Sequence, residues 1–197
     1  MLRHLRGSMT FFKDNSYNIV KMFLYQFGMT FFGMITSMAA QNNSGLFLTV
    51  SIYASVFYLG LLYVMTWELG AKERIRVDAG HATADRLAGL KMSLFAAIPN
   101  FIVFLLIAVG FVFGVAVMQA GWAQSMFIVG HAIGIIIQAM YNGIVNALIP
   151  AGGNALSSAY LITYAITPLP AIIFSTFGYL MGWNNRRLFG FLQKKKK

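Results

Sequence analysis

Residues 125–150, SMFIVGHAIGIIIQAMYNGIVNALIP, form an apolar stretch that is long enough to cross a bilayer as one helix. Polar side chains recur within it at spacings of seven, four and four residues, at His131, Gln138, Asn142 and Asn146. In an α-helix these spacings place the side chains on one face. The stretch therefore predicts a membrane-spanning helix with one continuous polar stripe, which Pro150 ends.

The chain around this stretch carries few charges. It is 58% hydrophobic and 10% charged, with a mean hydropathy of +0.68, far from the balance of soluble proteins. No Asp, Glu, Lys or Arg occurs between Lys91 and Arg186, and the charges gather in residues 3–21, 68–91 and 186–197. The composition predicts an all-α, polytopic integral membrane protein.

The charged clusters divide the chain into a basic N-terminal flank (1–21), a single transmembrane helical domain (22–183) and a basic tail (184–197). The expected apolar segments of the domain are about 22–40, 46–67, 92–118, 125–149 and 155–183. A cytoplasmic loop at 68–91 joins the second segment to the third. For the first segment a cleaved signal peptide is the alternative, but the length of the run favours a retained helix.

Both ends of the chain are basic, and Lys and Arg favour the cytoplasmic side of a membrane. Five straight crossings would put the two ends on opposite sides. One solution has four full crossings and a last segment that turns inside the membrane at Pro168 and Pro170 and leaves where it entered. The other has five crossings, with a proline-broken last helix and the tail outside.

The last segment carries a second polar stripe, formed by Tyr160, Tyr164 and Thr167. Two glycine pairs with GxxxG spacing, a pattern that allows close helix packing, lie in the third and fourth segments. These are Gly110 with Gly114 and Gly130 with Gly134.

Common catalytic and metal-binding motifs are missing from the sequence. The chain has no Cys, no phosphate-binding loop and no paired carboxylates in its apolar part. His4, His81 and His131 fall in three different segments, which disfavours a shared metal ion. The basic residues flank apolar spans, and the aromatic residues sit mainly in the apolar runs and not among the basic ones, which disfavours nucleic acid as a partner. We expect no enzyme, no cofactor and no metal.

The functional expectation is a non-enzymatic component of a solute path, similar in role to a transporter or permease. The fourth and fifth segments would line the path for a neutral or weakly charged solute. The alternative is an assembly or scaffold subunit whose polar and small residues hold helices together. His131 serves either as a hydrogen-bonded core residue or as a gate.

The expected location is the cell membrane, with the N-terminus and the loop 68–91 cytoplasmic, and a bacterial inner membrane is favoured over the endoplasmic reticulum. The lipid bilayer is one partner, and the terminal lysines would anchor the tail on anionic lipid. A further subunit would dock on the loop 68–91 or on the tail.

Overall fold

The computed structural model describes residues 2–40, 42–117, 119–149 and 158–186, and every regular element in these ranges is helical. This confirms the all-α class for the described residues. The elements in chain order are α1 (Leu2–Ala40), α2 (Ser44–Asp78), α3 (Ala88–Ala96), α4 (Ile98–Phe111), the π-helix η1 (Val112–Ala116), α5 (Gly121–Ile137), the 3₁₀ turn η2 (Ala139–Tyr141), α6 (Asn142–Leu148), α7 (Ser158–Ile166) and α8 (Leu169–Trp183).

Three segments are each long and apolar enough to cross a membrane, namely Thr10–Ala40, Ser44–Asp78 and Ala159–Trp183. Two further pairs of helices reach that length only together, because each is bent at a short break. The bend is 51° between α3 and α4 and 81° between α5 and the η2–α6 segment. The described chain thus holds three to five elements of membrane length.

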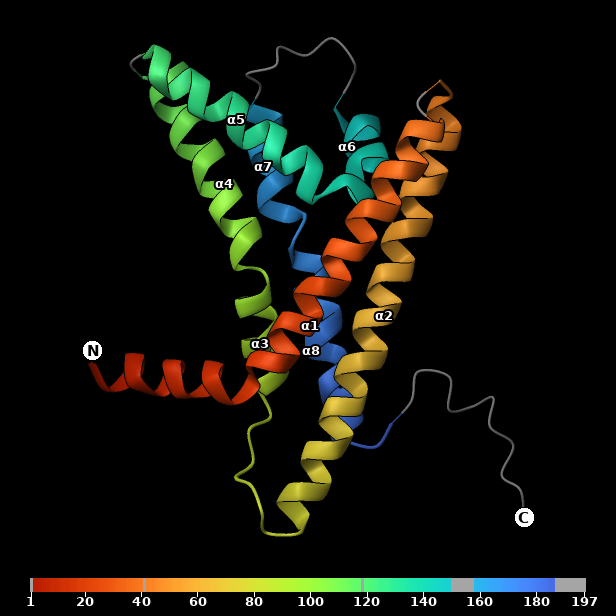
Figure 1. Cartoon of the computed structure of the whole chain (residues 1–197), viewed down its shortest axis with the longest axis vertical. Coiled ribbons are helices and arrows are strands. Elements are labelled where there is room, and N and C mark those ends of the chain that lie inside the picture. The colour runs from red at the N-terminus through yellow and green to blue at the C-terminus, as the bar shows by residue number, and fades with distance from the viewer. Residues whose placement is uncertain (1, 41, 118, 150–157, 187–197) are drawn as a thin grey trace.

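Figure 1 shows how these elements follow one another along the long axis. We call the end with the α2–α3 loop the charged end, because the charged parts of α1, α2 and α3 lie there. α1 leaves this end, α2 returns to it, and α3 with α4 leads away again. α5 runs only part of the way back, and α6 turns away from the charged end once more. α7 and α8 then return to the charged end.

The expected straight helix at 125–149 is therefore wrong, because α5 ends at Ile137 and the chain changes direction at Gln138. Side chains bond the carbonyl groups that this break leaves open. The Thr30 hydroxyl donates to the Ile137 carbonyl at 2.7 Å. The Asn142 amide reaches across the break to the Ile135 carbonyl at 3.1 Å. These bonds replace the lost helical ones, which an apolar surrounding would otherwise leave unpaired.

Close backbone contacts hold η2 and α6, together called the reversed segment, in place. The backbone of Met140 lies directly against Gly33 of α1, where any side chain would overlap it. The Gly143 amide donates to the Ser51 hydroxyl of α2 at 2.8 Å. Small residues on α1 and α6 thus let η2 and α6 pack against the two long helices.

The last segment also differs from one of its two expected forms. Ala159–Trp183 continues in one direction through Pro168 and Pro170, so the expected re-entrant turn at these prolines is wrong. Pro168 is the N-cap of α8 and Pro170 stands at its second position. A proline in the first turn removes an amide that has no helical partner there, so the helix direction is kept. The proline-broken form is the one observed.

The loop expected at 68–91 is shorter than predicted. α2 continues past Trp67 to Asp78, with a Glu68–Lys72 pair at 3.8 Å and an Arg74–Asp78 pair at 2.9 Å along its surface. Each pair is spaced by four residues and adds only a few tenths of a kcal/mol. Gly80 has a φ of +74°, which favours glycine and ends the helix here.

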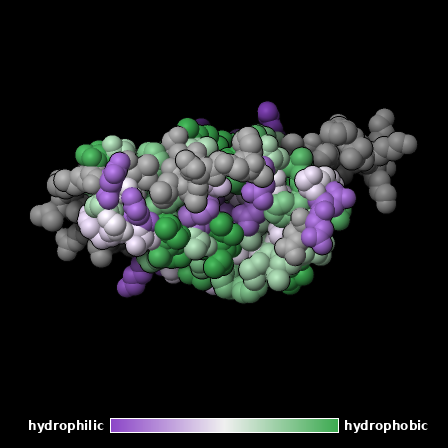
Figure 2. Space-filling view, turned by 90° about the horizontal axis from the view of Figure 1, so that it is seen from above, coloured by the Kyte–Doolittle hydropathy of each residue, from purple (hydrophilic) through white to green (hydrophobic). Residues whose placement is uncertain are grey.

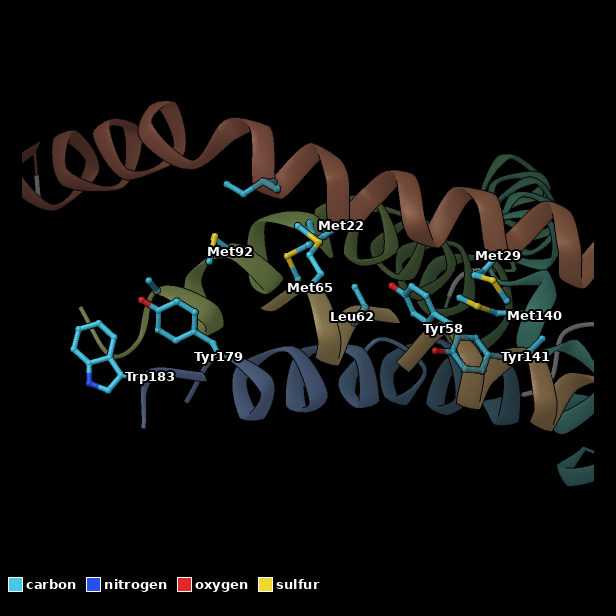
Figure 3. Packing of buried hydrophobic residues seen from close by; sticks show 14 residues of the cluster. Met22, Met29, Tyr58, Leu62, Met65, Met92, Met140, Tyr141, Tyr179 and Trp183 are labelled. Carbon is cyan, nitrogen blue, oxygen red and sulfur yellow. The ribbon is translucent and has the colours of Figure 1, made fainter. Parts of the chain in front are cut away.

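Methionine and aromatic residues make up much of the larger buried cluster, which joins α1, α2, α3, η2 and α8 (Figure 3). A smaller cluster of Val103, Ile107, Phe127 and Tyr164 joins α4, α5 and α7. Large aliphatic side chains such as Ile102 and Leu105 are more than half exposed. Seen from above, apolar surface extends along one side of the molecule (Figure 2). Such sides fit a hydrocarbon surrounding.

Candidate functional site

A small cavity lies where three interruptions of the helices meet. Its lining includes Ala97 from the α3–α4 bend, Tyr141 from the α5–α6 reversal and Pro168 from the start of α8. About 20 Å³ of the cavity is open to the centre of a water molecule, which is room for about one water. All of its lining residues are uncharged. The polar ones are Gln26, Tyr58, Ser93, Asn100, Tyr141, Thr167 and Ser175.

Three buried amide side chains meet beside this cavity. Gln26 and Asn100 bond reciprocally, with Gln26 Nε2 donating to Asn100 Oδ1 at 2.8 Å and Asn100 Nδ2 donating to Gln26 Oε1 at 3.0 Å. Gln138 Nε2 donates to the same Asn100 oxygen at 3.3 Å. All three residues are buried. The amide cluster therefore ties α1 and α4 to the tip of the reversed segment.

Three polar atoms in this region lack a hydrogen-bond partner within the described residues. They are Gln138 Oε1, the Tyr141 hydroxyl and Ser175 Oγ. Tyr141 and Ser175 line the cavity, and Gln138 is bonded to Asn100, which lines it too. A buried polar group without a partner costs about 1–3 kcal/mol. A small polar molecule in the cavity would offset part of this cost.

Figure 3 shows Tyr58 and Tyr141 next to each other, with both hydroxyls pointing toward the side of Leu62. Tyr58, Leu62 and Tyr141 all line the cavity. The tyrosines come from α2 and η2, so the cavity wall is shared by a long helix and the reversed segment. The wall combines apolar rings with hydroxyl groups that can donate and accept hydrogen bonds.

His131 lies in a separate aromatic cluster on α5 and α7. Its Nδ1 lies 3.1 Å from the Tyr164 hydroxyl, and its carbonyl oxygen lies 3.3 Å from the same hydroxyl. The Tyr160 ring centre is 4.4 Å from the imidazole centre. The ring of Tyr164 covers Gly134, where a larger residue would not fit. Two residues of the second predicted stripe thus contact the first residue of the first stripe.

The four polar residues predicted to share one face do not do so, because the chain reverses between them. Gln138 joins the amide cluster, whereas Asn142 bonds the end of α5. Asn146 is exposed on α6. Thr167 donates to the Thr163 carbonyl of its own helix at 2.6 Å and lines the cavity.

The predicted glycine pairs lie at helix contacts. Gly110 and Gly114 face the backbone of α5 at Phe127 and Gln124, and Gly130 faces Ile107 of α4. α4 and α5 can therefore approach closely. Pro150 lies outside the described residues.

Sequence reasoning did not identify several residues of the site. Gln26, Asn100 and Ser175 are not among the site residues predicted from the sequence. The available signal was an isolated amide in each of two otherwise apolar segments, since such groups are costly in a membrane unless they pair. Ser175 has no comparable signal, because single serines are common in apolar helices.

Comparison of the chain with protein-family models, with curated proteins and with solved structures finds no match. Among the described residues no three His, Asp or Glu side chains lie close enough together to hold a metal ion.

Proposed function

We propose that the protein is an integral membrane protein that crosses the bilayer four times. α1, α2, the α3–α4 pair and the α7–α8 segment would each cross once, and α5 with α6 would enter and leave on one side. The charged end would then be cytoplasmic, because its Lys and Arg residues favour that side. A reporter fused after Lys197 tests this arrangement, and a signal from the outer side would contradict it.

Within this arrangement we propose a non-enzymatic role in the passage of a small uncharged solute, with the central cavity as the narrowest point of the path. The supporting observation is that three helix interruptions meet at one cavity, and that two residues of its wall, Tyr141 and Ser175, have hydroxyls without a partner within the described residues. Broken helices inside a membrane are tolerated where they are buried in protein or line a watery cavity. In many transporters such breaks form the substrate site near the midplane.

The uncharged lining sets the kind of solute. A charged molecule would lose its hydration in a cavity that offers no opposite charge, at a cost that neutral molecules avoid. The Tyr141 and Ser175 hydroxyls in the cavity wall can each donate or accept a hydrogen bond. A molecule that both donates and accepts would therefore pair with these groups best.

Cysteine reactivity tests this proposal directly, since the chain has no native Cys. Ser175→Cys places a thiol in the cavity wall, and Ser51→Cys provides a matched control. Ser175 and Ser51 are equally buried, at 0% and 2% exposure, but Ser51 lies outside the cavity and bonds Gly143. A thiol must ionise to react, which requires water.

We expect S175C in liposomes to react with a water-soluble methanethiosulfonate reagent at least about tenfold faster than S51C, as a partly hydrated thiol would. Equal inertness of both variants would contradict a solute path. Stopped-flow swelling of the same liposomes in glycerol or urea would then measure which small neutral solutes pass.

A second candidate is a scaffold that docks a cytoplasmic partner. The observation in its favour is the charged part of α2, where Lys72 and Arg76 have 71% and 64% of their side chains exposed. Mixed charges on a protruding helix can give partner specificity. Inert cysteines together with loss of a copurifying subunit in a K72E/R76E variant would favour this candidate.

A further inference from the structure

A second hollow lies next to the cavity, between α2, α6 and α7. It is a groove of about 510 Å³, and most of its lining is aliphatic, including Leu59, Ile144 and Val145. Ile162 and Ile166 on its α7 side are 59% and 54% exposed. In a bilayer the groove would therefore open sideways toward the lipid.

The groove and the cavity share two residues of their walls. Tyr141 and Thr167 line both spaces, and both residues are buried. Thr167 already donates to the Thr163 carbonyl, whereas the Tyr141 hydroxyl has no partner within the described residues. An apolar groove thus ends at an unpaired hydroxyl that stands before a polar cavity.

We infer that the groove binds an amphiphile with one apolar chain and a small uncharged hydroxyl head, such as a long-chain alcohol, at the side of the proposed path. The inference rests on the proposed function, because the head would bond a wall that the groove shares with the proposed path. The chain would lie in the groove, and the head would bond Tyr141 at the boundary with the cavity. Access would be lateral, from the membrane and not from water.

The size and polarity of the cavity and the groove favour an alcohol as the bound molecule. The cavity has room for a group about as large as water, so a hydroxyl fits it and a phospholipid headgroup does not. The groove is lined mainly by apolar side chains and holds no charged residue, which suits a hydrocarbon chain. A fully polar solute would gain little from the groove, because apolar surface offers it no hydrogen bonds.

Photolabelling in liposomes that contain the full chain tests the inference. Two diazirine probes of equal chain length are compared, one derived from hexadecanol and one from hexadecane. We expect the hydroxylated probe to label residues 144–149 and 159–170 about fivefold more than the hydrocarbon probe, the effect of one net hydrogen bond. Labelling of the exposed face of α4 at Ile102 and Leu105 should not distinguish the probes.

Tyr141→Phe should reduce that fivefold preference to about one, since it removes the hydroxyl and keeps the ring. Tyr53→Phe is the matched control, because Tyr53 is a 64% exposed tyrosine of α2 outside the groove. In the unmodified chain, unlabelled hexadecanol should compete with the probe and hexadecane should not. This competition needs no variant to fold.

Equal labelling by both probes would overturn the inference, because it would mean that ordinary lipid chains fill the groove. So would a preference that survives Y141F. If S175C nevertheless reacts faster than S51C, the solute path stands and only the amphiphile is excluded. If S175C is inert while the hydroxylated probe is preferred, the groove binds an alcohol and the watery path fails.

Discussion

The α5–η2–α6 segment and the α7–α8 segment are both apolar, are both interrupted near their middle, and both line the central cavity. They differ in what the interruption does. The first bends by 81° and returns toward its own side, whereas the second continues as one element of 25 residues. The second has prolines at its break, at Pro168 and Pro170, and the first has none.

The difference shows that contacts with other helices decide the direction of the chain here, and local helix breakers do not. At the reversal, Thr30 bonds the end of α5, Gly33 admits Met140, and Ser51 bonds Gly143. At the proline break the Thr167 hydroxyl bonds its own helix. A reversal inside an apolar surrounding needs partners from outside the segment, while a proline in a first turn does not.

The largest effect is expected from filling the space at Gly33, which lets the reversed segment pack against α1. Gly33→Leu would force a side chain into the backbone of Met140, so α1 or η2 would have to move. We expect a loss of about 3 kcal/mol in the free energy of unfolding, at the upper end of overpacking effects. Chemical denaturation in detergent micelles measures it.

Gly28→Leu is the control for this variant, in the same helix and with nothing within 4 Å of the added atom. It should be neutral or stabilising by up to about 1 kcal/mol, because leucine is the better helix former. Similar losses in G28L and G33L would mean that the reversed segment does not depend on the contact at Gly33.

The sequence predicts some of these features and not others, for physical reasons. The absence of charge between Lys91 and Arg186 and the long apolar runs predict the helical class. Glu68 and Lys72 predict their own ion pair, because helical neighbours are close in sequence. The reversal at Gln138 was not predicted, since the groups that stabilise it come from α1 and α2.

The candidate site shows the same contrast between features that depend on nearby residues and features that depend on distant ones. Gln138 is conspicuous as an amide in an apolar stretch, and it does lie beside the cavity. Its partner Asn100 lies 38 residues earlier, a separation at which spacing gives no information about contact. Periodicity placed Asn146 on the same face as Gln138 by assuming one straight helix, and the reversal at Gln138 removes that assumption.

The amide cluster of Gln26, Asn100 and Gln138 provides a second test. Gln138 stands at the reversal, whereas the α7–α8 segment contributes no residue to this cluster. Asn100→Leu would leave the amides of Gln26 and Gln138 unpaired, and we expect a loss of about 2 kcal/mol. Replacing all three amides by leucine should recover most of this loss, since no buried polar group then lacks a partner. Tryptophan fluorescence during unfolding reports both values.

An Asn100→Leu variant as stable as the unmodified chain would show that the cluster contributes nothing to holding the reversal. An equally unstable triple variant would point instead to a steric effect of leucine at one of these positions.

The smallest expected effect concerns the prolines themselves. Pro170→Ala should change the free energy of unfolding by no more than about 0.5 kcal/mol, because the second position of α8 does not need the amide that alanine adds. Pro99→Ala is the matched variant, since Pro99 holds the same position in α4. A cysteine at Asn185 should stay accessible from the same side of the membrane in P170A. A change of side would show that Pro170 sets the direction of the last segment, and the contrast between the two broken segments would then come from local sequence after all.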